Sequence, residues 1–337
     1  MGASGPADLA AAVAAAFGLG PVRGQPRSVP GGRSHLLWQV RTSTGRWAVK
    51  QLNRSREPWW LADYLVAAGV EAAAFRAGVA MPRPVPPLRP GAGTLADLPI
   101  GAGLVSVLVH EWCPGRPLPD LDVPAAVADW VGATLAVLHA LPVEPGVAQQ
   151  YPVYPADEWA VWLRDPPAET SAGFLAAVRD YLPDVDRAER VANQPPGWLT
   201  PVRTHRDVKP DNVLVTPDTP ILVDWDGAGP DFAEWEAIRA ALAFSRTRAG
   251  WDRVQFGRTL RAYRAAGGRQ IPPEPAAFAG LLRAQVGAAA WLLWRALGHR
   301  PVTPPERAAA HGHTLEALAD MRASLGQLTV WPHWLTD

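Results

Sequence analysis

The sequence predicts an α+β fold whose N-terminal third mixes strands with helices and whose remainder is mainly helical. Two observations lead to this prediction. Short runs of β-branched and apolar residues between turn residues, typical of antiparallel strands, lie in the first third and in one hairpin near residue 215. Segments with apolar residues at helical spacing make up most of the rest of the chain.

The N-terminal third is predicted to form a small lobe with an antiparallel sheet and helices. Pro30-Gly31-Gly32 and Ser43-Thr44-Gly45 are the turn residues of a hairpin pair. The expected elements are a helix over 7–17, strands within 27–52, a helix over 57–77, a loop over 82–101 that is rich in Pro and Gly, and a strand over 103–112.

The segment Cys113-Pro114-Gly115-Arg116-Pro117 interrupts regular structure, so we place a lobe boundary there. The predicted domains are a small lobe at 1–112 and a large lobe at 113–337. The large lobe is expected to contain a helix over 124–140 and mainly helical segments over 156–192 and 231–330.

Composition excludes several classes of protein. The 337 residues carry 32 basic and 32 acidic side chains, whereas a nonspecific nucleic-acid binder needs a basic excess. The single cysteine, Cys113, excludes a disulfide framework. The most apolar stretch, 281–297, is interrupted by charged and polar residues, so no membrane span is expected. We expect a cytoplasmic protein that binds neither nucleic acid nor membrane; its oligomeric state stays open.

The most informative segment is the string HRDVKPDN at residues 205–212. Two apolar triplets, 213–215 and 221–223, follow it and flank a turn rich in Pro, Asp and Thr, which predicts a short antiparallel hairpin. Asn212 comes just before the first strand and Asp224 just after the second. The open ends of a hairpin lie side by side, so the two side chains are expected at one edge.

This placement suits phosphoryl transfer. Carboxylate and amide oxygens at Asn212 and Asp224 are ligands for a hard cation such as Mg²⁺ held jointly with phosphate oxygens, and Asp226 is a second candidate carboxylate. Asp207 is placed to accept a proton from an attacking hydroxyl. Only Lys50 and Lys209, among 32 basic residues, are lysine, which indicates positions that need a compact ammonium group.

H-R-D-x-x-x-x-N followed by a strand ending in D-W-D resembles the catalytic and metal-binding segments of the bilobal protein-kinase-like fold. The string WAVK at 47–50 resembles the strand whose lysine contacts nucleotide phosphates. Two further segments, VGATLAVLH at 131–139 and DWDGAGP at 224–230, bring the match closest to the aminoglycoside phosphotransferase/choline kinase family. The resemblance covers residues 28–245.

The resemblance implies ATP or GTP and Mg²⁺ as cofactors and a small hydroxylated acceptor, namely an aminoglycoside-like antibiotic, a sugar or an amino alcohol. It implies catalytic roles for Asp207 and Lys209 and metal ligation by Asn212, Asp224 and Asp226. The nucleotide-binding residues that it implies are Gly31, Gly32 and Ser34 in a phosphate-covering loop, Lys50 with Glu71 as its ion-pair partner, and Glu111 and Cys113 at an adenine-binding hinge.

Several alternatives stay open. Gly31 and Gly32 fit a plain hairpin turn equally well, and Glu57 competes with Glu71 as partner of Lys50. Arg206, where the family usually has glycine, together with Lys209, favours a protein serine/threonine kinase as a second reading. A helical pattern resumes by about Phe232, which leaves no room for a peptide platform. A non-catalytic nucleotide-binding module is a third reading.

Overall fold

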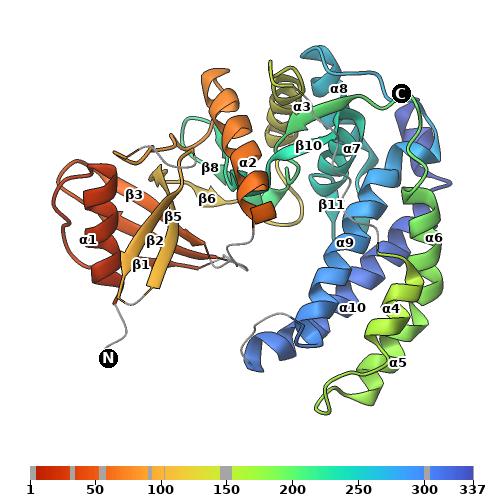
Figure 1. Ribbon diagram of the computed structural model, residues 1–337. Helices are drawn as coiled ribbons and strands as arrows, with labels where there is room; N and C mark the ends of the chain where they lie inside the picture. Colours follow the sequence, from red (N-terminus) through yellow and green to blue (C-terminus); the bar gives the residue numbers. More distant parts are fainter. Residues whose placement is uncertain are drawn as a thin grey trace. The chain divides into compact units, whose positions relative to one another are not determined.

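The computed structural model describes residues 5–30, 35–52, 58–89, 93–101, 103–144, 154–299 and 304–336. The chain divides into two compact units (Figure 1). The N-terminal unit comprises Met1–Asp120, Ala140–Val143 and Arg203–Gly229, and the C-terminal unit comprises Leu121–His139, Glu144–Val202 and Pro230–Asp337. The segment around the 205–212 motif thus groups with the N-terminal sheet, and the lobe boundary after residue 112 stays a prediction.

The N-terminal unit is built on a five-stranded antiparallel sheet in the order β1-β2-β3-β5-β4. The strands are β1 (Arg27–Val29), β2 (Leu36–Arg41), β3 (Arg46–Leu52), β4 (Ala96–Ile100) and β5 (Gly103–Glu111). The predicted strands within 27–52 and over 103–112 are therefore confirmed. β3 lies at the centre, so Lys50 is carried by a strand that is hydrogen-bonded on both sides.

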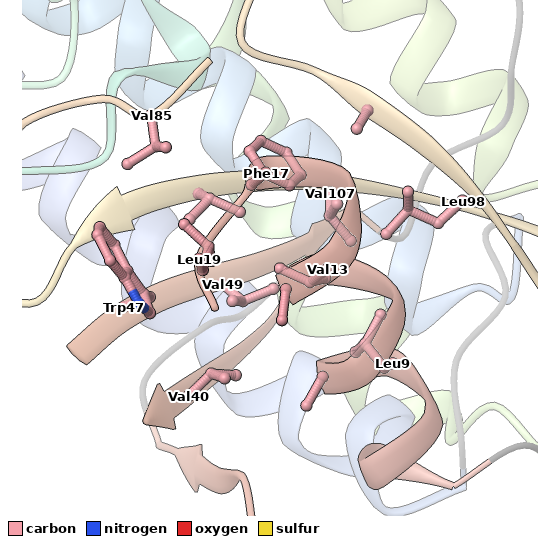
Figure 2. Close-up of a cluster of buried hydrophobic side chains, with 14 residues drawn as sticks. Leu9, Val13, Phe17, Leu19, Val40, Trp47, Val49, Val85, Leu98 and Val107 are labelled. Carbon is pink, nitrogen blue, oxygen red and sulfur yellow. The ribbon is translucent and has the colours of Figure 1, made fainter. Parts of the chain in front are cut away.

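Each face of this sheet has its own helix. Helix α1 (Pro6–Phe17) packs its apolar side against Val49 and Val107, as Figure 2 shows. Helix α2 (Pro58–Arg76) covers the other face, where Trp60 and Tyr64 pack against the neighbouring strands. Side chains alternate along a strand, so Lys50 projects to the face opposite Val49, the face that α2 covers.

The expected loop over 82–101 is partly wrong, because residues 96–100 form β4. The abundance of Pro and Gly in this segment led to the loop prediction, and Pro99 itself lacks the N–H that a central strand must donate. β4 is an edge strand with one hydrogen-bonded neighbour, where a proline is tolerated. Ala96 and Leu98 are buried on the α1 face, and their burial favours the strand.

The predicted hairpin near residue 215 is confirmed. β8 (Val213–Val215) pairs with β9 (Pro220–Leu222), and β6 (Arg116–Pro117) pairs with the outer side of β8. Short 3-10 turns stand at both open ends, η1 (Pro210–Asn212) and η2 (Trp225–Gly227). The Leu222 N–H donates to the carbonyl of Ala80 (2.9 Å), which fixes the hairpin beside the segment that follows α2.

The C-terminal unit is mainly helical, as predicted. Its helices are α3 (Ala125–His139), α4 (Ala156–Trp162), α5 (Ala172–Asp180), α6 (Leu182–Ala192), α7 (Ala233–Ala243), α8 (Arg253–Ala265), α9 (Ala279–Ala296) and α10 (Pro304–Gln327), with 3-10 turns η3 (Pro275–Phe278) and η4 (Trp331–Leu335). The other short strands among the described residues are β7 (Pro201–Thr204), β10 (Gly229–Phe232), β11 (Arg246–Thr247) and β12 (Gly250–Trp251).

A buried polar network joins three of these helices. His139 of α3 shares hydrogen bonds of 2.8 Å with the Tyr263 hydroxyl of α8 and with the Glu236 carboxylate of α7. The helical segment Pro275–Ala296 is long and apolar enough to span a membrane, but 61% of its apolar window is buried inside the protein. Such burial is typical of the core helix of a soluble protein and makes the segment weak support for a membrane span.

Candidate functional site

His205 connects the motif at 205–212 to the strand end that precedes Asp224. Its side chain is fully buried, and Nε2 donates to the carbonyl of Val223 (2.9 Å). Nδ1 accepts the Asp207 N–H (3.3 Å), which requires the Nε2–H tautomer. The ring lies edge-on to Trp225, with 4.6 Å between ring centroids. His205 therefore sets the backbone position of Asp207, a role that the sequence analysis did not assign.

The carboxylate of Asp207 is held from two sides. Asn212 Nδ2 donates to Asp207 Oδ2 (2.9 Å) and to the Asp207 carbonyl (2.8 Å), and Lys209 Nζ lies 2.8 Å from the same Oδ2. The contacts from Asn212 and Lys209 are both made to Oδ2, so Oδ1 is the carboxylate oxygen that can accept a hydrogen bond from another molecule. The Asp207 side chain is 47% exposed, which gives that oxygen access to solvent.

Asn212 and Asp224 stand at the mouth of the hairpin, as their spacing predicts. The Val223 N–H donates to the Asn212 carbonyl (2.9 Å), so the residue before Asp224 is paired directly with Asn212. Asn212 uses its amide nitrogen on Asp207, which leaves Oδ1 as its acceptor atom. Asp224 adopts a left-handed backbone with φ of 70°. Such strain in a non-glycine residue is concentrated at functional sites.

Lys50 completes this cluster within the N-terminal unit. Its Nζ lies 2.9 Å from Asp226 Oδ1 and forms a second ion pair with Asp224. Burial alone would lower the pKa of Lys50, but the charges of Asp226 and Asp224 outweigh it and raise the pKa above its ordinary value. The amine is therefore charged at neutral pH and suited to bind anions.

Asp226 has a second partner in His35, which the sequence analysis did not single out. His35 Nε2 lies 3.2 Å from Asp226 Oδ2, and both side chains are largely buried. Burial raises the pKa of Asp226, but the hydrogen bond from His35 and the charge of Lys50 outweigh it and hold that pKa well below its usual range. Asp226 is thus ionised at neutral pH, as a carboxylate must be to bind a metal ion.

The ion pair predicted between Lys50 and Glu71 is not formed in this structure. Glu71, which is 5% exposed on α2, instead accepts a hydrogen bond from His110 Nε2 (2.7 Å). His110 lies on β5 opposite Ala48, on the same sheet face as Lys50, so its ring reaches the carboxylate predicted to pair with Lys50. Lys50 forms its ion pairs with Asp224 and Asp226 instead, and a nucleotide role for Glu71 stays a prediction.

The other predicted nucleotide contacts have different outcomes. Gly31, Gly32 and Ser34 lie outside the residues that the structure describes. At the expected hinge, the Glu111 N–H donates to the Arg83 carbonyl (2.9 Å), and the Glu111 carboxylate accepts from Arg83 Nε (3.2 Å). Cys113 is partly buried, and its thiol contacts the Glu111 carbonyl at 3.9 Å. Adenine binding at this segment stays a prediction.

The predicted metal ligands fit a shared rather than an all-protein site. Within the described ranges, no group of three or more His, Cys, Asp and Glu side chains is arranged to hold an ion. Mg²⁺ is ordinarily bound by one or two carboxylates together with substrate phosphates and water. The Asn212 amide oxygen with Asp224 and Asp226 is a hard-oxygen donor set of that kind, so these residues fit the cation.

Replacing His205 with alanine is expected to destabilise the protein by about 2–4 kcal/mol, since it opens a cavity under Trp225 and leaves the Val223 carbonyl without its donor. Urea titration at neutral pH measures this loss. The matched control is His313→Ala on the exposed side of α10, with an expected change within about 0.5 kcal/mol. Equal stability of the two variants would contradict the anchoring role of His205.

The chain is similar to a known protein family and to several solved structures. The model of the APH family, described as the phosphotransferase enzyme family, matches residues 26–265. No curated protein sequence matches the chain. Among solved structures, spectinomycin phosphotransferase APH(9)-Ia in complex with ADP and spectinomycin superposes with a TM-score of 0.68 and 13% identity, covering 94% of this chain and 98% of that one.

Two further structures share the fold. A choline/ethanolamine kinase family protein from Mesorhizobium loti has a TM-score of 0.59 and 20% identity, covering 98% of each chain. The amicoumacin kinase hAmiN, in complex with AMP-PNP, Ca²⁺ and Ami, has a TM-score of 0.61 and 13% identity, covering 91% of each chain. The predicted α+β protein-kinase-like fold is therefore confirmed. Since the family model spans most of the chain, the protein belongs to the APH phosphotransferase enzyme family.

Proposed function

We propose that this phosphotransferase moves the γ-phosphate of ATP or GTP to a hydroxyl of a small polyhydroxylated acceptor in the cytoplasm. The acceptor class comprises aminoglycoside-like antibiotics, sugars and amino alcohols. One observation carries the proposal. Lys50, Asp224 and Asp226 form a cluster of ion pairs at the open end of the hairpin of β8 and β9, and Asn212 at the same end hydrogen-bonds the Asp207 carboxylate. Structural neighbours that are antibiotic kinases or an aminopropanol kinase support the acceptor class.

In this proposal Asp207 orients the acceptor hydroxyl through Oδ1 and takes its proton as the oxygen attacks phosphorus. Lys209 and Asn212 hold Oδ2 and prevent the carboxylate from rotating away. Lys209 also places a positive charge beside the transferred group, where negative charge has to be balanced. Positioning and charge are the main contributions that a protein makes to phosphoryl transfer.

Lys50 binds the nucleotide phosphates with an amine that its surroundings keep charged. Asn212, Asp224 and Asp226 would hold Mg²⁺, which supplies positive charge to the phosphate oxygens when bound. His35 keeps Asp226 oriented and ionised, and His205 keeps Asp207 in place. Each of these positions is fixed by a contact within the N-terminal unit.

A protein serine/threonine kinase is the second candidate, because the string HRDVKP at 205–210 is close to the form found in those enzymes. The chain after Asp226 argues against it. Helix α7 begins at Ala233, directly after β10, so the described chain has no long segment there to hold a peptide. The family match and the small-molecule kinases among the neighbours favour the first candidate.

The proposal is tested by a coupled assay of ATP and GTP consumption with Mg²⁺ over aminoglycosides, other hydroxylated antibiotics, sugars, choline and ethanolamine. Mass spectrometry of the acceptor then confirms the phosphate ester. We expect nucleotide consumption that depends on one acceptor class. Phosphate transfer to generic protein substrates, with none to any small molecule, would replace this proposal with the protein-kinase alternative.

Replacing Lys50 with methionine is expected to raise the KM for ATP about 10–100-fold, because one charge-assisted contact to phosphate is lost. Initial rates at varied ATP measure the change, and thermal unfolding checks that the variant is folded. Arg46→Met is the matched control, since Arg46 is exposed on the same strand. A KM for ATP within about twofold of the wild type would remove Lys50 from the nucleotide site.

A further inference from the structure

The C-terminal unit contains a cavity of about 130 Å³ beside helix α8. Four arginines line it, Arg253, Arg261, Arg264 and Arg269, and none of the described residues that line it is acidic. The sequence alone favours a solvated helix face for the arginines of this region. The structure instead places several of them around one hollow.

The hollow follows from the spacing of residues along α8. Arg253, Gly257, Arg261 and Arg264 occur at i, i+4, i+8 and i+11, which brings them to one face of the helix. Gly257 adds no side chain to this face. A Cβ atom there would lie 3.0 Å from Arg261 Nη1, so glycine leaves room for the guanidinium at the cavity.

The rest of the lining is apolar. Leu260, Ile271 and Trp334 contribute aliphatic and aromatic surface, and the buried Tyr263 also lines the cavity. The Tyr263 hydroxyl already hydrogen-bonds His139, so this residue offers the cavity its ring rather than a donor. The site thus combines a cationic wall with an apolar one.

The four arginines give the cavity lining a positive charge that the chain as a whole does not have, because its acidic and basic residues are equal in number. Arginine side chains stay positively charged throughout the physiological pH range, so a hollow lined by four of them attracts anions. Guanidinium forks pair with phosphate through two parallel hydrogen bonds. A phosphate monoester carries about −1.5 to −2 charges at neutral pH, which balances several arginines better than a single carboxylate does.

We propose that this cavity is a second ligand site, which binds a small organic phosphate with its phosphate on the arginines and its apolar body against Leu260, Ile271 and Trp334. All of its lining residues belong to the C-terminal unit, and none is assigned to phosphoryl transfer above. The inference therefore stands independently of the proposed function.

Isothermal titration of the full chain with phenyl phosphate tests the site, because this probe combines a phosphate with an aromatic ring. We expect saturable binding that weakens with added salt, and weaker binding of inorganic phosphate and of benzyl alcohol. In the double variant Arg261→Gln/Arg269→Gln, affinity for phenyl phosphate is expected to fall at least about tenfold, or 1.4 kcal/mol. Both side chains are exposed, so this variant is expected to fold.

Two controls separate this site from others. Arg258→Gln removes an arginine of the same helix that faces Asp129 (3.6 Å) and does not line the cavity, and it should bind phenyl phosphate as the wild type does. Lys50→Met should also retain binding, because Lys50 belongs to the proposed nucleotide site. Unchanged affinity in the double arginine variant, or binding of inorganic phosphate as tight as that of phenyl phosphate, would overturn the proposal.

Discussion

The Asp207→Asn variant is expected to lose about 10³-fold in kcat for phosphoryl transfer, because an amide cannot take the acceptor proton. Its Kd for nucleotide should stay within about twofold of the wild type, since Asp207 contacts Asn212 and Lys209 rather than Lys50. The substitution keeps the size of the side chain and an oxygen that can accept from Asn212. The loss therefore reports on proton transfer and charge rather than on folding.

Single-turnover rates with saturating ATP and acceptor measure the chemical step, and calorimetry measures nucleotide binding. Asp218→Asn is the matched control, since Asp218 is exposed in the turn between β8 and β9 and should leave both quantities unchanged. If Asp207→Asn kept wild-type turnover, another group would have to accept the proton. If it lost nucleotide binding instead, Asp207 would have to be reassigned to the nucleotide site.

The parts of the site that follow from local spacing could be predicted from the sequence. The hairpin between 213 and 222 is defined by two apolar triplets and a turn, so its pairing brings Asn212 beside the residue before Asp224. The strand that carries Lys50 is defined in the same way by alternation and turn residues. In such cases a few neighbouring residues determine the geometry, and their order in the sequence is enough.

Partners that are distant in sequence could not be predicted in this way. Glu71 bonds His110 and Lys50 bonds Asp224 and Asp226, although spacing permits Lys50 to pair with Glu71. The choice depends on which carboxylate the tertiary fold brings nearest, and sequence separation does not encode that distance. His35 next to Asp226 is a further case, since residues 36–225 separate the two in the sequence.

Backbone strain is a third feature that residue types did not reveal. Arg206 has a φ of 70°, in the left-handed region that glycine adopts without cost. This conformation explains why glycine suits the position in the family that the motif resembles. An arginine there costs about 1–2 kcal/mol of backbone energy, which the surrounding structure has to offset. The Arg206 side chain lies against Gly229, within the same unit.

The largest expected effect on stability is at Gly132 of α3, which lies directly against the backbone of α8. A Cβ atom at this position would lie 2.2 Å from the Thr259 carbonyl oxygen and 2.7 Å from the Tyr263 nitrogen. Both are backbone atoms, so no rotamer change can relieve the contact, and the helices would have to separate. Separation would also stretch the hydrogen bond between His139 and Tyr263, which joins the same two helices.

We therefore expect Gly132→Ala to destabilise the protein by about 3 kcal/mol or more, although alanine is the better helix former by about 1 kcal/mol. Gly287→Ala in α9 is the matched control, because its Cβ would have no neighbour within 4 Å, and it should stabilise the protein by about 0.5–1 kcal/mol. Chemical denaturation of both variants measures the two changes. If Gly132→Ala lowers the free energy of unfolding and Gly287→Ala raises it, the loss at residue 132 comes from the contact between the helices and not from replacing a glycine as such. A stabilised Gly132→Ala variant would show that α3 and α8 are not packed this closely.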